Sequence, residues 1–359
     1  MAPTCFGADG LFGGGERYPL ELARALAREV DCELVTFGRS TRVVREPGGL
    51  RVRVLRPWVR LRGHPAHPVN PALPAVLSGA DVVHTHHMRS APSRVAAVAA
   101  RMAGRSLAVT DHGLGGGGWW GMLPRLFDRF LVVSHFSATT LGAPPDRTAV
   151  VYGGADPARY HPSARGEERE GVLFVGRLTP HKGVDLLIRA VPPDVPLTVV
   201  GTRGHDSRPP ESGYPELLAR LARGRRVRFV TRADDAEVAA LYRRAAVVCL
   251  PSVHVTCYGR RVEISELLGL AAIESMASGT PVICSRLDGL VEVVRHGETG
   301  FLVEPGNAAE LRDRIATVLA DRRLARCLGD NARRLALERF TWQACAQRCL
   351  TAYQPMAAR

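Results

Sequence analysis

The sequence predicts an α/β protein made of two doubly wound parallel-sheet domains. The chain has 359 residues, which is more than one ordinary core requires and enough for two domains of about 150–200 residues. Hydrophobic residues make up 46% of the chain, so sizeable cores are available and global disorder is excluded. Apolar runs of strand length alternate with helix-like segments in both halves, as expected for parallel sheets covered by helices.

The charge of the chain favours phosphorylated ligands. The formal net charge is +13, and Lys182 is the only lysine among 48 basic residues. Such a charge is compatible with nucleic acid, with an anionic membrane face or with phosphorylated small molecules. No nucleic-acid-binding motif accompanies it, and aromatic residues make up only 6% of the chain. We therefore expect phosphorylated ligands, with a peripheral membrane contribution and no nucleic-acid partner.

Neither a membrane span nor a metal centre is expected. The sequence contains no run of 18 apolar residues and does not start with a signal pattern, so a cytoplasmic protein is predicted. None of the eight cysteines forms a C-x-x-C pair, which favours buried reduced thiols. Cys345 and Cys349 share a helix face, but no second ligand pair accompanies them.

The first domain is expected to cover residues 1–165 and to open with a glycine loop. Only about six residues precede Gly7, which is expected either of a short first strand or of a start site that is placed too late. Gly14 and Gly15 then stand at the entrance of a helix that runs from residue 16 to about 29. Glycines there are either flexible punctuation or make room for a phosphate or a sugar. Residues 32–37 read as the next strand.

Residues 50–61 (LRVRVLRPWVRL) alternate basic and apolar side chains at the period of a strand. Our preferred interpretation is a strand with one solvated face. The alternative is a basic surface between Arg51 and Arg62 that touches acidic lipid or an anionic acceptor. Residues 64–74 are rich in proline and are predicted to be a loop.

Histidines gather where two predicted strands end. A short strand at 80–84 leads into Thr85, His86 and His87, and after a helix at about 93–103 the strand 107–110 leads into Asp111, His112 and Gly113. Ligands bind at the carboxyl ends of strands in such sheets, although a histidine there is often only structural. The spacing of His84 and His86 suggests a metal pair, but we expect strand alternation to point them to opposite faces and reject that site.

The rest of the first domain is predicted from shorter signals. Gly115–Gly118 with Trp119 and Trp120 form a loop that either packs or borders an acceptor. A strand at 131–134 precedes a helix that begins at 137. Residues 163–170 are charged and lack apolar spacing, so the domain boundary is placed there.

The second domain, residues 166–339, opens with a buried strand at 172–175 and the loop G-R-L-T-P-H-K-G at 176–183. Arg177 offers a planar fork for phosphate oxygens, and Lys182 adds a compact charge. An arginine and a lysine five positions apart are ordinarily surface charges. The alternative is a phosphate site, in which Gly176 lets the chain turn tightly and the two cations hold phosphate oxygens. Further strands are predicted at 197–201, 227–230 and 247–251, and helices at 184–190, 215–223, 234–245, 308–319 and 323–337.

The segment 263–303 has a fixed order of parts that suits a nucleotide-sugar. Glu266 precedes a helix that opens near Gly269 and Leu270, whose first N–H groups form an anion site. Gly269 lacks a Cβ, so a ligand can approach the backbone. Glu274 lies roughly 6 Å further along the helix axis, a reach that suits a ribose on the bound phosphate. An isolated pair of carboxylates, in contrast, ordinarily favours only a helix start.

The run E-L-L-G-L-A-A-I-E-S-M-A-S-G-T-P-V resembles the E-x(7)-E signature of retaining family 4 glycosyltransferases. Leu268 replaces the usual aromatic residue, and the match continues through S-R-L-D-G-L-V-E-V-V-R-H-G-E-T-G-F-L-V. The resemblance implies the GT-B fold, with two Rossmann-like domains facing across a cleft. T-D-H-G resembles the family's active-site histidine segment, G-R-L-T-P-H-K-G its diphosphate loop, and G-G-A-D its inter-domain turn. Residues 340–359 resemble the last helix, which returns to the first domain.

The resemblance also implies roles for single residues. Glu274 would bind the ribose and Glu266 the transferred sugar, while Arg177, Lys182 and the helix start at Gly269–Leu270 would stabilise the leaving diphosphate. Gly14 and Gly15 would border the donor, and His112 would position the transferred sugar. The reaction would be a metal-independent, retaining front-face transfer with no cofactor beyond the nucleoside diphosphate sugar, to a small-molecule, lipid or glycan acceptor.

Other functions remain open at this stage. An epimerase or a phosphorylase of the same architecture would share most motifs, but the second needs a pyridoxal site, and Lys182 is the only lysine available for one. A non-catalytic basic binding protein would depend on the charge of +13 alone. Its binding would weaken steeply with salt.

Overall fold

The computed structural model describes residues 1–3, 14–64, 66–112, 121–163, 168–203 and 209–357. The predictions made for Gly7, for Gly115–Gly118 and for Trp119 and Trp120 lie outside these residues. The chain divides into two compact units. The first comprises Met1–Gly153 and Trp342–Arg359, and the second comprises Gly154–Thr341.

The described part of the first unit contains two larger sheets that a short segment joins, and a separate two-stranded sheet. One sheet has the strand order β1-β3-β2, and the other, which is parallel throughout, has the order β6-β7-β8-β9. The N–H of Ala2 donates to the carbonyl of Val35 in β1, and the N–H of His86 in β6 donates to the carbonyl of Met1, each at 3.0 Å. The strands are β1 (Glu33–Phe37), β2 (Arg42–Arg45), β3 (Arg51–Leu55), β6 (Val82–His86), β7 (Ser106–Thr110), β8 (Arg129–Val132) and β9 (Thr148–Val150).

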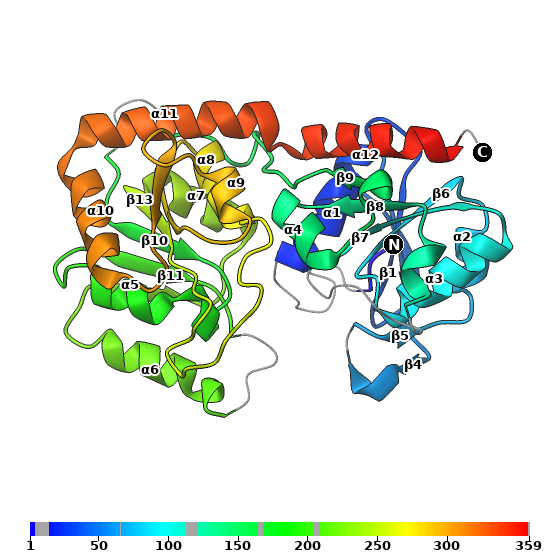
Figure 1. Cartoon of the computed structure of the whole chain (residues 1–359), viewed down its shortest axis with the longest axis horizontal. Helices are drawn as coiled ribbons and strands as arrows, with labels where there is room; N and C mark the ends of the chain where they lie inside the picture. The colour runs from blue at the N-terminus through cyan, green and yellow to red at the C-terminus, as the bar shows by residue number, and fades with distance from the viewer. Residues whose placement is uncertain (4–13, 65, 113–120, 164–167, 204–208, 358–359) are drawn as a thin grey trace. The chain divides into compact units, whose positions relative to one another are not determined.

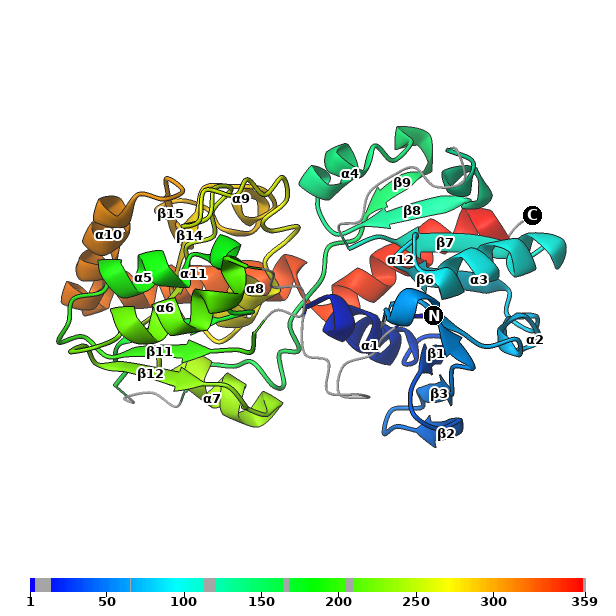
Figure 2. The same cartoon turned by 90° about the horizontal axis from the view of Figure 1, so that it is seen from below.

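Helices complete this unit. α3 packs against β6 and β7, and its small buried residues Ala96, Ala97 and Ala100 let it lie close to them. α12 packs against α1 and against the parallel strands, and Figures 1 and 2 show it running along the sheet. The helices are α1 (Gly14–Leu26), α2 (Leu73–Leu77), α3 (Ala91–Met102), α4 (His135–Leu141) and α12 (Trp342–Ala357), with short 3₁₀ turns η1 (Leu61–Gly63), η2 (Leu123–Leu126) and η3 (Pro145–Arg147).

The second unit is built on one parallel sheet of six strands in the order β12-β11-β10-β13-β14-β15. In chain order this is 3-2-1-4-5-6, the strand order of the doubly wound dinucleotide-binding fold. The order reverses between β10 and β13, so the two chain segments that leave these strands diverge there. The strands are β10 (Val172–Val175), β11 (Leu197–Val200), β12 (Val227–Val230), β13 (Val247–Leu250), β14 (Val282–Ser285) and β15 (Gly300–Val303).

Helices cover the faces of this sheet. α5 packs beside α6 and α10, whereas α8 packs beside α7 and α11. The central strands are buried on both sides, as their near-continuous Val, Leu and Ile content requires. The helices are α5 (Val184–Ala190), α6 (Tyr214–Leu221), α7 (Asp235–Arg244), α8 (Leu270–Ala277), α9 (Leu290–Val293), α10 (Ala308–Ala320) and α11 (Arg322–Arg339), with the 3₁₀ turns η4 (Pro180–Lys182) and η5 (Glu211–Gly213).

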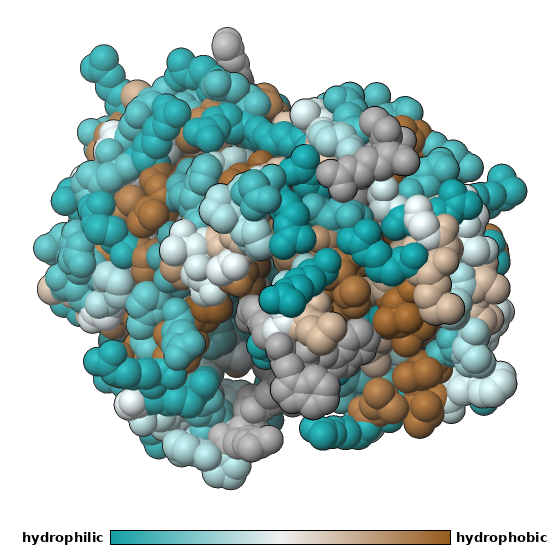
Figure 3. Space-filling view, turned by 45° about the vertical axis from the view of Figure 1, so that its right-hand side comes forward, coloured by the Kyte–Doolittle hydropathy of each residue, from teal (hydrophilic) through white to brown (hydrophobic). Residues whose placement is uncertain are grey.

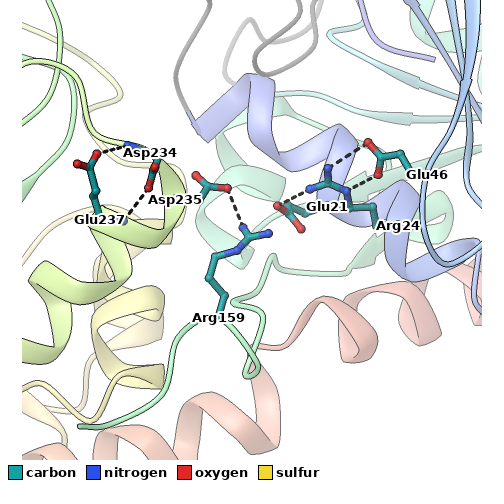
Figure 4. A network of polar contacts seen from close by, with 7 residues as sticks. All are labelled: Glu21, Arg24, Glu46, Arg159, Asp234, Asp235 and Glu237. Atoms are coloured by element: carbon teal, nitrogen blue, oxygen red, sulfur yellow. Dashed lines mark hydrogen bonds and ion pairs between the residues drawn. The ribbon is translucent and has the colours of Figure 1, made fainter.

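The division between the units lies at Gly153–Gly154, earlier than the boundary that the charge pattern predicted after residue 165. The segment that begins at Gly154 is held by the second unit. Arg159 forms an ion pair with Asp235 at the start of α7, at 3.1 Å, which Figure 4 shows. The ring of Tyr160 lies 5.8 Å from that of Tyr242. These contacts assign the segment after Gly153 to the second unit, although the charged stretch at 163–170 suggested a later boundary.

Three predictions about strands need correction. The predicted strand at 50–61 ends at Leu55, and the chain then forms a separate hairpin of β4 (Val59–Arg60) and β5 (Pro68–Val69). The proline-rich stretch predicted as loop therefore contains β5, and it also contains the start of α2. The strand predicted to end at His84 continues to His86, because Thr85 and His86 pair with β7.

The described residues include no helix that is long and apolar enough to cross a membrane. All seven cysteines in the described part of the chain are free thiols. Four of them are buried, as expected, namely Cys249, Cys284, Cys345 and Cys349, whereas Cys257 and Cys327 are exposed.

Candidate donor-binding site

The candidate site of the second unit lies at the carboxyl ends of β10, β13 and β14. The loop after β10 spans residues 176–183, the loop after β13 spans 251–269, and the loop after β14 spans 286–289. β10 and β13 are the neighbours between which the strand order reverses, which is where doubly wound sheets bind their ligands. The sheet order therefore brings together loops that are far apart in the sequence.

Lys182 and Glu266 meet at this edge of the sheet. Lys182 Nζ lies 2.6 Å from Glu266 Oε1, and the two side chains are only 13% and 14% exposed. Lys182 Nζ also donates to the carbonyl of Ser265 at 2.9 Å, and Ser252 Oγ donates to Glu266 Oε1 at 2.8 Å. Two residues that the sequence selected separately thus form one ion pair in a poorly hydrated place, where charge interactions are strong.

The two loops are also joined through the backbone of His181. Its carbonyl accepts from the N–H of Val253 at 2.8 Å and from Ser265 Oγ at 3.2 Å. Burial, reinforced by the cations Lys182, Arg177 and Arg260, lowers the pKa of His181 to about 3. His181 is therefore neutral at physiological pH, and the positive charge of this loop comes from the lysine and the arginines.

Arg177 differs from Lys182 in its surroundings. Its side chain is exposed, and the structure does not bring it onto Glu266 as it brings Lys182. It is close enough to His181 to lower the pKa of that ring. Arg177 thus adds positive potential at the rim of the site, and its long side chain leaves it free to reorient toward an anion.

α8 begins where it was predicted to begin. Gly269 is its N-cap with φ +96°, and no side chain caps the helix, so its first N–H groups lack acceptors within the helix. The structure gives glycine a further reason at this position, beside the predicted approach of a ligand. A Cβ at Gly269 would lie 2.5 Å from Leu290 Cδ2, so glycine is required by the left-handed backbone and by packing against Leu290.

Glu274 lies on the buried side of α8. It is 7% exposed, and Tyr242 of α7 donates its hydroxyl to Glu274 Oε2 at 3.0 Å. A carboxylate held in this way has a fixed orientation, which suits recognition of a ligand with paired hydroxyl groups. Tyr242 was not singled out from the sequence. One tyrosine in an amphipathic helix carries no sign of its partner.

Asp288 is the main residue of the site that sequence reasoning missed. Its Oδ2 accepts from the N–H of Ser265 at 2.8 Å and from the N–H of Glu266 at 3.0 Å. Its Oδ1 lies 2.8 Å from His254 Nε2, and its side chain is only 2% exposed. Asp288 adopts φ +49°, a conformation that Asp tolerates better than most residues. A buried carboxylate therefore fixes the backbone that carries Glu266.

The first unit holds a cluster of histidines at the ends of β6 and β7, in which His86 is buried and His84 and His112 are partly buried. The rings of His84 and His86 lie 4.6 Å apart, so the expectation that they face opposite sides was wrong. Residues two apart in a strand share a face. His86 Nδ1 lies 3.1 Å from His112 Nε2, and these rings are stacked at an interplanar angle of 14°. His84 Nε2 instead contacts Thr110 Oγ1 at 2.8 Å, which gives it a structural partner.

The cluster is neutral. Burial first, and then neighbouring histidines, lower the pKa values of His86 and His112 well below the ordinary value. Burial lowers the pKa of His84 to about 3. His112 can therefore donate or accept a hydrogen bond as an imidazole, but it does not supply a positive charge at neutral pH. Among the described residues no group of histidines, cysteines and carboxylates has the arrangement of a metal site.

α1 brings further predicted residues to this cluster. Gly14 is the first residue of α1, and a Cβ on Gly15 would lie 3.7 Å from the ring of His87. The ring of His87 is in turn 4.9 Å from that of His112. Tyr18 contacts His112 edge-on at 4.9 Å and donates its hydroxyl to the carbonyl of Tyr152. The predicted glycine entrance and the predicted histidine thus belong to one region of the first unit.

Two family models match successive parts of the chain. The one described as "Glycosyltransferase Family 4" matches residues 12–159, and the one described as "Glycosyl transferases group 1" matches residues 160–335. The first covers the glycine entrance and the histidine cluster, and the second covers Lys182, Glu266 and Glu274. Both site regions therefore fall within matched segments.

Curated relatives include a D-inositol 3-phosphate glycosyltransferase of Corynebacterium glutamicum, 35% identical over 237 residues, which are 60% of this chain and 53% of the relative. The MMP alpha-(1->4)-mannosyltransferase of Mycolicibacterium hassiacum is 33% identical over 258 residues, 67% of this chain and 59% of the relative. The chain spans between half and three fifths of the length of these relatives.

Solved structures resemble the whole chain. A sucrose-phosphate synthase of Thermosynechococcus elongatus aligns with a TM-score of 0.77 and 25% identity, covering 100% of this chain and 98% of that one. HepE of Anabaena, solved in complex with UDP and glucose, aligns with a TM-score of 0.75 and 20% identity over 96% of this chain and 97% of that one. The chain belongs to the group 1, family 4 glycosyltransferases and has the GT-B fold.

Proposed function

We propose that the chain transfers a sugar from a nucleoside diphosphate sugar to an acceptor with retention of anomeric configuration. The observation that carries the proposal is the contact of Lys182 with Glu266 at the edge where the strand order reverses. A cation there suits the diphosphate, and a carboxylate beside it suits the hydroxyls of the transferred sugar. HepE of Anabaena, which shares this fold, was solved with UDP and glucose, which supports a donor of this class.

In the proposed reaction the bond between the anomeric carbon and the diphosphate oxygen breaks on the face where the acceptor attacks. The acceptor oxygen bonds to that carbon, and its proton passes to the departing phosphate oxygen. Lys182, Arg177 and the N–H groups at Gly269–Leu270 stabilise the negative charge that grows on the diphosphate. These groups supply the positive field, so the proposal requires no metal ion and no further cofactor.

The remaining residues bind and orient the donor. Glu274, fixed by Tyr242, binds the ribose, and Glu266 binds the transferred sugar. His112 is a neutral hydrogen-bonding partner for that sugar rather than a proton carrier, because burial depresses its pKa. Gly14 and Gly15 border the donor at the start of α1. The proposed acceptor is a small molecule, a lipid or a glycan. For the protein itself we propose a cytoplasmic location with a peripheral membrane contact.

A thermal-shift screen against UDP, GDP, ADP, dTDP and CDP without added metal tests the donor site. A ligand that binds only the native state raises the melting temperature. We expect one nucleotide to stand out, and Glu274→Ala to lose most of its shift. Glu298→Ala removes an exposed carboxylate of the same unit and should keep the shift. If millimolar amounts of all five nucleotides leave the melting temperature unchanged, the proposed donor site is wrong.

A further inference from the structure

The hairpin of β4 and β5 in the first unit presents an apolar tip. We call residues 56–63 the Trp58 segment. Trp58 is 80% exposed, Val59 is 52% exposed and Leu61 is 47% exposed. Figure 1 shows the hairpin reaching away from the sheet of this unit, and Figure 3 shows apolar residues at the surface in the lower part of the unit. A tryptophan this exposed has lost little water on folding, so the fold itself does not account for it.

The Trp58 segment is held in place at its base. The N–H of Trp58 donates to the carbonyl of Val69 at 2.9 Å, and the N–H of Leu61 donates to the carbonyl of His67 at 2.9 Å. Asn70, which is buried, donates its side-chain amide to the carbonyl of Arg56 at 2.7 Å. The exposed side chains therefore project from an ordered support, and their display costs little further entropy on binding.

The charge around this segment has one sign. Residues 47–80 contain no Asp or Glu, and three arginines, Arg56, Arg60 and Arg62, fall within the segment itself. The N–H of Arg56 donates to Thr41 Oγ1 at 3.0 Å, which brings the stretch with Arg42 beside it. Apolar side chains with arginines on either side match a surface that is anionic outside and apolar within.

The structure separates this segment from the basic strand before it. Arg51 and Arg53 of β3 both form ion pairs with Glu33 of β1, and Arg51 also lies 3.8 Å from Asp31, so two neighbouring carboxylates offset their charges. For residues 50–61 we considered a strand with one solvated face and a basic contact surface. The first interpretation fits β3, and we now apply the second only to the Trp58 segment.

We propose that the Trp58 segment inserts into the interface of an anionic lipid bilayer. Trp58 and Leu61 would enter the boundary between headgroups and acyl chains, and the arginines would contact lipid phosphates. Each arginine near such a surface strengthens binding by about fivefold. The inference gives a surface to the proposed membrane contact, and it does not depend on glycosyl transfer.

Vesicle co-sedimentation of the full chain tests the inference. One set of vesicles contains phosphatidylcholine alone, and the other contains equal parts of phosphatidylcholine and phosphatidylglycerol. We expect binding to the mixed vesicles, with a loss of at least about tenfold in Trp58→Ser/Leu61→Ser, the scale for removing two interfacial anchors. The matched control is Met102→Ser, which removes a side chain that is 85% exposed at the end of α3 and should bind as the parent chain does.

Three outcomes would overturn the inference. The first is absence of binding to the mixed vesicles at low salt, and the second is equal binding by Trp58→Ser/Leu61→Ser and the parent chain. The third concerns a soluble polyanion such as single-stranded DNA. If it displaces the parent chain and the double variant from the vesicles equally well, the apolar side chains do not contribute to binding. The nucleotide thermal shift of the double variant should equal that of the parent chain. This keeps a failed lipid inference distinct from a failed donor site.

Discussion

Lys182 is the only lysine of the chain, and the structure places its ammonium 2.6 Å from Glu266. We expect Lys182→Ala to lower turnover by about a hundredfold or more, the scale for losing one strong transition-state donor. Arg177→Ala should lower turnover by a similar factor, because it removes a second cation that stabilises the leaving diphosphate. Steady-state kinetics with a nucleotide-sugar donor measures both. Arg295→Ala removes an exposed arginine of the same unit and serves as the control. Near-normal turnover in both Lys182→Ala and Arg177→Ala would remove the diphosphate assignment.

Asp288 acts on the site through the backbone of Glu266. Asp288→Gly keeps the left-handed backbone but removes the carboxylate, and Asp288→Asn keeps one acceptor oxygen. We expect kcat to fall by about tenfold or more in the glycine variant and less in the asparagine variant, because hydrogen bonds to a charged group are worth about 1.5–3 kcal/mol. The ratio of kcat to KM effects, measured beside the melting temperature, separates positioning from stability. If kcat falls in each variant only in proportion to its loss of melting temperature, Asp288 supports the fold and does not position Glu266.

Among single residues, those that belong to a sequence motif were predicted. Those that act through a contact made only in the folded chain were not. Lys182, Glu266 and Glu274 stand in recognisable runs. Tyr242 stands outside any such run, and Asp288 stands inside the run S-R-L-D-G-L without being singled out, because the importance of both depends on partners 22 to 32 positions away. The error at His84 and His86 was of another kind, since the period of a strand already puts both rings on one face.

α8 and α7 together form the proposed ribose site. Tyr242→Phe removes the hydroxyl that orients Glu274 and leaves the ring packed against Tyr160. We expect the affinity for the best nucleoside diphosphate to fall by about fivefold, which corresponds to one hydrogen bond of about 1 kcal/mol. Glu274→Ala should weaken binding further. Calorimetry measures both affinities. A phenylalanine variant that binds as tightly as the parent chain would show that Tyr242 does not orient the carboxylate.

Elements with a continuous apolar run were predicted closely. β10 has the predicted bounds, 172–175, and its residues V-L-F-V form a continuous apolar run. β12 also has its predicted bounds, 227–230, although Arg228 interrupts its apolar residues. β2 was not predicted. Its four residues, R-V-V-R, are all exposed, and only the neighbouring β3 makes them a strand. The hairpin of β4 and β5 was missed for the same reason, since two-residue strands leave no periodic signal.

The distribution of buried neutral histidines differs between the two units. In the described part of the first unit, His67, His84, His86 and His112 all have lowered pKa values, and burial is the main cause. The second unit has His181, whose pKa is lowered to about 3. A histidine that is neutral when folded binds a proton more readily when unfolded, so its contribution to stability is present above pH 6.5 and is lost as the pH falls.

Acid should therefore weaken the first unit before the second. Below pH 6.5, each such histidine lowers the free energy of unfolding by up to about 1.4 kcal/mol per pH unit, until the pH reaches the pKa of that histidine in the folded protein. Hydrogen exchange at pH 7 and pH 5, corrected for the intrinsic rate, measures this unit by unit. We expect protection of β6 and β7 to fall more than that of β10 and β13. Among the described residues, three histidines with lowered pKa values lie in or after the first pair of strands, and one, His181, lies after β10 of the second pair. Equal losses of protection in both sheets would show that the histidine cluster does not set the acid stability of the first unit.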